Sequence, residues 1–150
     1  LRILSSKKFL HLNLNIVIGV NNIKYSLIKK LARLRPKTKI YYNLPNLINV
    51  IKKSDIVISS GGTVIWEFIF FKIPSLVINQ ANNQIYNSKY LHKAGAIKLY
   101  KGKTINLTTL KKFLRDNLLK KRFKISYKIT KLFDGNGTLR VKKIINDNLK

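Results

Sequence analysis

The stretch Ser54–Gln84, SDIVISSGGTVIWEFIFFKIPSLVINQANNQ, decides the fold of this 150-residue chain. Within it, Asp55–Ile58 is a short β-branched run that predicts a buried parallel strand. The SSGG turn breaks that run before an apolar helix, which we expect to begin at Thr63. A second apolar run, Ser75–Ile78, predicts another strand, and a polar loop follows it. The stretch therefore predicts a strand, a glycine turn, a helix, a strand and a polar loop.

The glycine pair Gly61 and Gly62 stands where the first strand becomes the helix. In an open α/β sheet this point lies at the carboxyl ends of the strands, where free N–H groups at a helix start favour an anion such as phosphate. Two glycines after a strand often serve only the turn, so the pair alone is weak evidence for a site. The amide side chains of Asn79–Gln84 fall at the same predicted edge. Together these features predict a nucleotide site that needs no metal.

The rest of the chain continues the alternation of strand and helix. Apolar runs predict three further strands, Asn13–Val20, Lys39–Tyr42 and Ala96–Tyr100. Helical patterns are predicted at Leu1–Leu10 (the end of a helix), Ile23–Leu34, Leu47–Lys53, Ile85–Lys93, Leu107–Leu119, Phe123–Leu132 and Thr138–Leu149. Five short strands alternating with helices are typical of an α/β fold. We expect a Rossmann-like parallel sheet with helices on both faces.

Composition places the chain among globular domains and suggests that it is part of a longer protein. It is 45% apolar, enough for a real core, and it contains no cysteine, as is common in a reducing cytoplasm. There is no methionine, and the first residues already look helical, so we expect the true start to lie upstream. The longest apolar stretch, Val64–Phe71, contains Glu67 and is too short to span a bilayer. These features predict a cytoplasmic domain.

The chain is strongly basic, with 31 Lys and Arg against 5 Asp and Glu and a formal net charge of +26. Such a charge raises nucleic acid and anionic membrane as partners. Most of the cations are scattered, as on solvated faces, and no nucleic-acid-binding signature accompanies them, so nucleic acid is the less favoured partner. The segment Lys111–Lys131 interleaves cations with apolar residues, as a basic amphipathic helix does. It predicts peripheral contact with an anionic membrane, although such a face more often belongs to an outer helix packed on a sheet.

Several kinds of chemistry are disfavoured by the residues present. The two histidines, His11 and His92, lie far apart without accompanying carboxylates, so we expect no metal site and no cofactor. Ser59 and Ser60 lack the surroundings of a nucleophile elbow and are interpreted as loop hydroxyls. The five acids offer no pair suited to hydrolysis by two carboxylates.

A few side chains allow both a binding and a structural interpretation. Glu67 is the only glutamate, and it could hold the hydroxyls of a ribose or pair with Lys72 on the helix surface. Trp66 is interpreted as a packing residue. Gln84 and Asn87 could cap the following helix or touch a ligand. Near the end of the chain, Asp134 is predicted to be an N-cap with Arg140 close by.

Four motifs, in this order, resemble a known family: SDIVISSGGTVIWE, IPSLVINQANNQ, NSKYLHKAGA and DGNGTLRV. The chain resembles the carboxyl-terminal domain of a GT-B nucleotide-sugar protein. Within that group it is most similar to the UDP-sugar hydrolase of pseudaminic acid biosynthesis, and more distantly to the lipid-linked N-acetylglucosaminyltransferase of peptidoglycan synthesis. It departs from the pattern at Lys72, where glycine is usual, and at Asn82, where an acid is usual.

The resemblance implies that residues 1–150 form a UDP-binding domain, truncated at its amino-terminal end, of an enzyme whose other domain carries the catalytic histidine. Here the catalytic residue is therefore unknown. The residues that the resemblance assigns to UDP are Ser60, Gly61, Gly62, Thr63, Glu67, Asn83, Gln84 and Asn87. The implied reaction is release of UDP from a UDP-linked 2,4-diacetamido-trideoxyhexose. The alternatives are the donor domain of a glycosyltransferase with a lipid or surface-polysaccharide acceptor, and a basic nucleic-acid-binding module.

Overall fold

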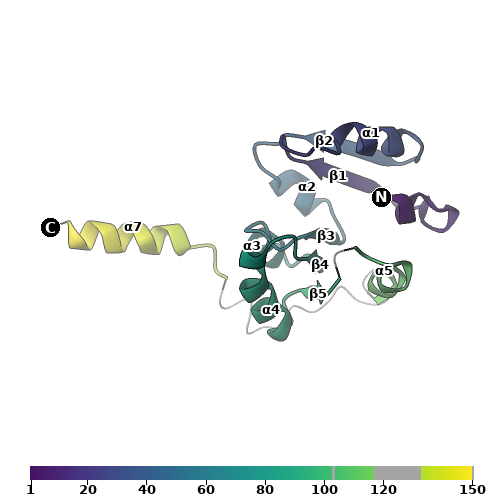
Figure 1. Cartoon of the computed structure of the whole chain (residues 1–150). Helices are drawn as coiled ribbons and strands as arrows, with labels where there is room; N and C mark the ends of the chain where they lie inside the picture. Colours follow the sequence, from purple (N-terminus) through teal and green to yellow (C-terminus); the bar gives the residue numbers. More distant parts are fainter. Residues whose placement is uncertain (103, 117–132, 150) are drawn as a thin grey trace. The chain divides into compact units, whose positions relative to one another are not determined.

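The computed structural model describes residues 1–102, 104–116 and 133–149 of the chain (Figure 1). It divides into two compact units, Leu1–Val50 and Ile51–Lys150. The expected helix Phe123–Leu132 lies outside the described residues, as does most of the basic segment Lys111–Lys131. Each unit has its own parallel sheet and is described by itself.

The amino-terminal unit is built on a two-stranded parallel sheet. Its elements are η1 (Arg2–Ser5), η2 (Lys7–Phe9), β1 (Leu14–Ile18), α1 (Tyr25–Arg33) and β2 (Thr38–Tyr42). The strands pair from Leu14 opposite Thr38 to Ile18 opposite Tyr42. Helix α2 (Ile48–Lys52) spans the division between the units.

The expected helix end at Leu1–Leu10 is wrong, because the structure has two short 3₁₀ turns there. Ser6 separates them with an extended backbone, while the Ser5 hydroxyl bonds back to the Leu1 carbonyl. Serine side chains compete with helical hydrogen bonds in this way. A similar effect delays α1, because the Asn22 side chain accepts from the Lys24 N–H and the helix begins only at Tyr25.

One buried cation, Arg35, joins the loops of the amino-terminal unit. Its side chain is 3% exposed, and its guanidinium donates to the carbonyls of Leu4, Phe9 and Leu12 at 3.0, 2.7 and 2.8 Å. It also bonds the Pro36 carbonyl and the Thr38 hydroxyl, both at 3.0 Å. Burial lowers the pKa of this guanidinium from its ordinary value. A single side chain thus supplies donors to several loop carbonyls, and that of Phe9 also accepts from the Leu12 N–H at 3.1 Å.

The carboxyl-terminal unit holds a three-stranded parallel sheet in the order β3-β4-β5. Its strands are β3 (Val57–Ser60), β4 (Ser75–Ile78) and β5 (Lys98–Tyr100). Its helical elements are α3 (Ile65–Phe70), η3 (Asn82–Gln84), α4 (Ile85–Lys93), α5 (Leu107–Leu114) and α7 (Gly137–Asn148).

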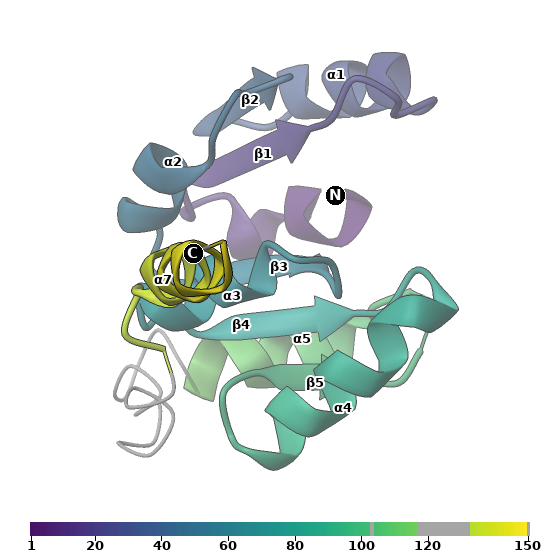
Figure 2. The ribbon, with the colours of Figure 1, turned by 90° about the vertical axis from the view of Figure 1, so that its left-hand side faces the viewer.

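Helices cover both faces of the three-stranded sheet. Successive strand residues point to opposite faces, and the fully buried Val77 of β4 packs in one cluster with Ile65 and Ile69 of α3 and Leu91 of α4. The neighbouring Leu76 instead lines a small pocket with Phe113 of α5. Figure 2 accordingly shows α4 in front of the sheet and α5 behind it. The expected α/β architecture with a doubly covered parallel sheet is confirmed here.

The boundaries of several elements differ from those predicted. Strands β1 to β5 form two separate parallel sheets rather than one sheet. Strand β3 is shifted by two residues from the expected Asp55–Ile58, because it pairs with β4 from Val57 opposite Ser75 and continues through Ser59 and Ser60. Pairing with a neighbour overrides the low strand preference of serine. Helix α3 begins at Ile65, two residues later than expected.

Replacing Arg35 tests its role in the amino-terminal unit. We expect Arg35→Met to lower the free energy of unfolding by about 3 kcal/mol or more, because several carbonyls lose a charged donor. Urea unfolding, followed by NMR signals of β1 and β2, measures the change. The matched control is Arg33→Met, which removes an exposed cation at the end of α1, two residues before Arg35. Equal stabilities of the two variants would contradict the role given to Arg35.

Candidate functional site

Two loops meet the carboxyl edge of the three-stranded sheet. The Gly61–Thr63 loop follows β3, and the Asn79–Gln84 loop follows β4. Because β3 and β4 are parallel and adjacent, both loops leave the sheet at the same edge. In open α/β folds this edge is where ligands bind.

The side chain of Gln84 joins these two loops. Its Oε1 accepts hydrogen bonds from the Gly61 N–H at 3.1 Å and from the Gln80 N–H at 2.9 Å. One amide oxygen therefore satisfies a backbone donor in each loop. As a consequence, the Gly61 N–H is already used within the protein.

The two glycines of the turn have different surroundings. A Cβ at Gly61 would collide with Asn79 Oδ1 and would lie 2.9 Å from Gln84 Cβ. A Cβ at Gly62 would have no neighbour within 4 Å. Gly61 is thus required by the packing of the protein itself, whereas Gly62 borders open space.

The backbone beyond Gly61 offers N–H donors that have no partner in the described part of the chain. Among the described residues, none accepts a hydrogen bond from the N–H of Gly62, Thr63 or Val64. The next amides are used, since Ile65 donates to Gly62 and Trp66 to Thr63. The first N–H groups of a helical turn have no intrahelical acceptor. Three consecutive donors are consequently open to water or to a ligand.

Glu67 lies one helical turn after Thr63 and is partly buried. No described residue makes a hydrogen bond or ion pair with its carboxylate, and the pairing with Lys72 that the spacing allowed does not form. Lys72 instead ends the turn after α3 with a positive φ of 56°. The carboxylate therefore keeps its acceptor capacity.

The remaining residues assigned to UDP are placed at the same edge but are not all in contact. Ser60 ends β3 and is partly buried, whereas Thr63, Asn83 and Asn87 are exposed. Of all the residues assigned to UDP, Gly61 and Gln84 are the pair that a hydrogen bond joins in the described structure. Gln84 occupies the N-cap position of α4, yet its side chain makes no capping bond there. The capping interpretation of Gln84 is therefore wrong, because its oxygen is bonded to the two loops.

Trp66 packs as predicted. Its ring lies 5.0 Å from that of Phe133, centroid to centroid, at an interplanar angle of 37°. Both side chains border the buried cluster of α3, β4 and α4. The packing interpretation of Trp66 is confirmed.

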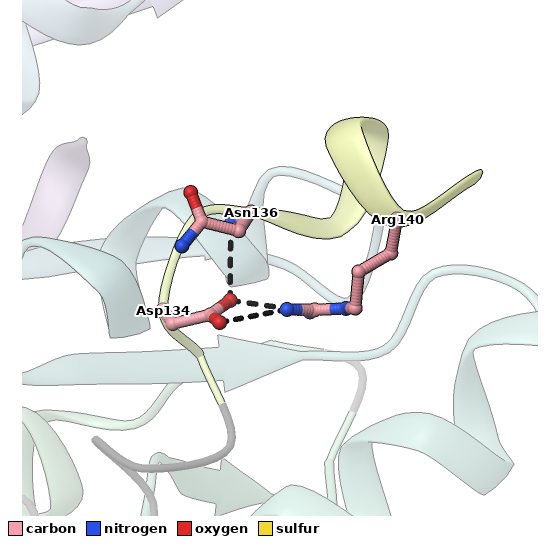
Figure 3. Close-up of polar contacts among 3 residues, drawn as sticks. All are labelled: Asp134, Asn136 and Arg140. Carbon is pink, nitrogen blue, oxygen red and sulfur yellow. Dashed lines mark hydrogen bonds and ion pairs between the residues drawn. The ribbon is translucent and has the colours of Figure 1, made fainter. Parts of the chain in front are cut away.

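Asp134 forms a different arrangement from the predicted N-cap. Its carboxylate accepts two hydrogen bonds from Arg140, at 2.7 and 3.1 Å, and one from the Asn136 N–H at 2.9 Å (Figure 3). Asn136, not Asp134, stands at the N-cap of α7. The Arg140 hydrogen bonds, with that of Asn136, lower the pKa of the Asp134 carboxyl to about 2. The expected closeness of Arg140 is confirmed, and the capping role is corrected.

The described part of the chain contains neither a cluster of metal-binding side chains nor a membrane-spanning helix. No group of three or more His, Cys, Asp or Glu side chains gathers there as a metal site would require. His92 Nδ1 lies 3.3 Å from the Ile97 carbonyl, while His11 is exposed. No described helix combines the length and the hydropathy needed to cross a bilayer.

Comparison with known proteins places the whole arrangement in a family. The model of the glycosyltransferase family 28 C-terminal domain matches residues 2–143, which include both loops and Glu67. The chain belongs to this family. An uncharacterized protein of Methanocaldococcus jannaschii is 32% identical over 91 residues, a match that covers 54% of this chain and 18% of the relative's length. The chain thus corresponds to a minor part of that relative.

The contrast between the glycines predicts different effects of adding one methyl group. We expect Gly61→Ala to lower the free energy of unfolding by about 1–3 kcal/mol, because Gln84 and Asn79 must move. Gly62→Ala should change it by less than about 1 kcal/mol, since the site is open. Thermal or urea unfolding of the two variants measures the difference. Equal destabilisation by both would contradict the packing described around Gly61.

The ion pair of Asp134 predicts a pH dependence. Because the folded pKa is lowered from 3.8 to about 2, the pair stabilises the start of α7 fully above pH 4 and progressively less as the pH falls toward 2. An NMR titration of the Asp134 carboxyl should show a midpoint near 2. We expect Arg140→Gln to move it up toward 3.8, and Lys142→Gln, which removes a cation from the same helix, to leave it low. An unchanged midpoint in Arg140→Gln would contradict the assignment.

Proposed function

We propose that this chain carries the nucleotide-sugar donor site of a glycosyltransferase, and that the nucleotide is UDP. The observation that carries the proposal is the family match, which extends from Arg2 to Lys143 and therefore includes the whole sheet edge. The Methanocaldococcus jannaschii relative is an uncharacterized protein, so the choice of UDP depends on the motifs in this chain. The geometry of the two loops supports the proposal independently.

Phosphate recognition is assigned to the Gly61–Thr63 loop. The open amides of Gly62 and Thr63 can donate to diphosphate oxygens, and the space beside Gly62 lets those oxygens approach the backbone. The Gly61 amide is bonded to Gln84 and has a structural part in this scheme. The Ser60 hydroxyl, at the end of β3, is a further donor at the same edge.

Ribose recognition is assigned to Glu67. Its carboxylate has no partner among the described residues and lies one turn beyond the phosphate loop. A carboxylate can accept hydrogen bonds from both ribose hydroxyls. The exposed amides of Asn83 and Asn87 are assigned to the diphosphate or the sugar, together with Nε2 of Gln84, which has no partner among the described residues.

Transfer from such a donor breaks the bond between the anomeric carbon and the diphosphate oxygen and forms a bond from an acceptor hydroxyl to that carbon. UDP leaves, and the acceptor proton passes to a base that we place in another domain of the whole protein. This chain contributes by orienting the donor and by stabilising charge on the departing diphosphate.

Hydrolysis is a second proposal that uses the same site. Release of UDP from a UDP-linked 2,4-diacetamido-trideoxyhexose differs from transfer only in having water as the acceptor. The motifs of this chain support it, whereas the family match favours transfer. The acceptor that we propose for transfer is a lipid or a surface polysaccharide. Turnover of the whole protein with and without added acceptor distinguishes the two.

Calorimetric titration of UDP into the chain and its Glu67→Gln variant tests the donor site. We expect the variant to bind roughly 10- to 100-fold more weakly, because hydrogen bonds to a charged acceptor are lost. Asp147→Asn is the matched control, since it removes an exposed carboxylate on α7. Each protein is titrated at low and at near-physiological salt. Weak binding that disappears with salt equally in all three would show that the +26 charge holds the nucleotide and would contradict the proposal.

A further inference from the structure

The oxygen of Gln84 has no capacity left for a ligand. A carbonyl oxygen has two lone pairs, and both are engaged by the Gly61 and Gln80 amides at 3.1 and 2.9 Å. The bonded residues are 23 and 4 positions away in sequence, so one side chain couples the loop after β3 to the loop after β4. This use is structural and is independent of any nucleotide.

A buried hydroxyl, that of Ser88, is hydrogen-bonded to the backbone carbonyl of Gln84. Ser88 lies one helical turn further along α4 and is 0% exposed. Its hydroxyl donates to the Gln84 carbonyl at 2.7 Å and accepts from Asn79 Nδ2 at 2.7 Å. The first turn of α4 is thereby fastened to the residue that follows β4.

Asn79 also limits the position of Gly61. Its Oδ1 is buried without a hydrogen-bond partner among the described residues, and it lies where a Cβ on Gly61 would be. A buried acceptor without a donor is costly. Gly61 is therefore in close contact with Asn79 and is also hydrogen-bonded to Gln84.

We infer that Gln84 is a positioning residue: its side-chain oxygen holds the Gly61–Thr63 loop in the shape that leaves the Gly62 and Thr63 amides open, and Ser88 and Asn79 hold Gln84. The inference deepens the proposed function and rests on it only for the identity of the ligand. It assigns the oxygen of Gln84 to the loops and leaves only its NH₂ group for a nucleotide. It also gives Ser88, which is fully buried, an indirect effect on binding.

Amide hydrogen exchange in the unliganded 150-residue chain tests the inference without a nucleotide. We expect Gln84→Ala to reduce the protection of the Gly61 amide about tenfold, because it loses its acceptor. Gln84→Glu should retain protection, since a carboxylate oxygen accepts the same bond. Ser88→Ala should reduce it by a smaller factor. The matched control Asn82→Ala alters an exposed amide in the same turn and should leave protection unchanged.

UDP titration of the same variants separates positioning from direct contact, because Ser88→Ala changes the support of Gln84 without removing a group assigned to the nucleotide. We expect Gln84→Ala to weaken UDP binding about tenfold, in parallel with the lost protection. Unchanged Gly61 protection in Gln84→Ala would overturn the inference, and a loss of affinity without a loss of protection would show that Gln84 contacts the nucleotide directly. Lost protection in a chain that binds no UDP would support the positioning role and overturn the proposed function. Should Gln84→Ala fail to fold, the comparison is made between Ser88→Ala, which should reduce protection of the Gly61 amide, and Gln84→Glu, which should retain it.

Discussion

The bonds from the Gly61 and Gln80 amides to the side-chain oxygen of Gln84 are the interaction on which the candidate site depends. A parallel sheet brings the ends of neighbouring strands together, but it does not determine the path of the loops beyond them. One amide oxygen that satisfies a donor in each loop sets that path. It also explains why Gly61 must be glycine, since Gln84 and Asn79 occupy the space of a side chain.

In the amino-terminal unit, too, one side chain bonds to several backbone groups, but there it is the donor rather than the acceptor. There Arg35 donates to the carbonyls of Leu4, Phe9 and Leu12, just as the oxygen of Gln84 accepts from two backbone N–H groups. Buried backbone groups need partners, and in short loops a single polar side chain can supply several of them. Both residues therefore act by joining segments rather than by filling the core.

The sequence predicted best those features that depend on neighbouring residues. Strand β4 and helix α4 were predicted with the bounds that the structure has, because a compact apolar run and a clear stop at Gly95, with a φ of 77°, define them. The position of β3 was not predicted correctly, because pairing with β4 determines where the strand begins and ends. The glycine turn was located correctly, but the bond from Gly61 to Gln84 spans 23 residues, and no spacing rule indicates it. Ser88 was missed because its bond with Asn79 joins residues nine positions apart, although a serine one turn after Gln84 is a weak signal.

Membership of the glycosyltransferase family 28 C-terminal domain supports the proposal that this sheet edge binds a nucleotide-sugar. The amides of Gly62 and Thr63 and the Glu67 carboxylate, which have no partner among the described residues, give the proposal a physical basis. Two-dimensional NMR of the chain during a UDP titration tests this account most directly. The account predicts that the amide signals of Gly62, Thr63 and Val64 move most, together with those of the Asn79–Gln84 loop. Shifts spread over exposed lysines, or confined to α5 on the sheet face away from α3 and α4, would contradict it.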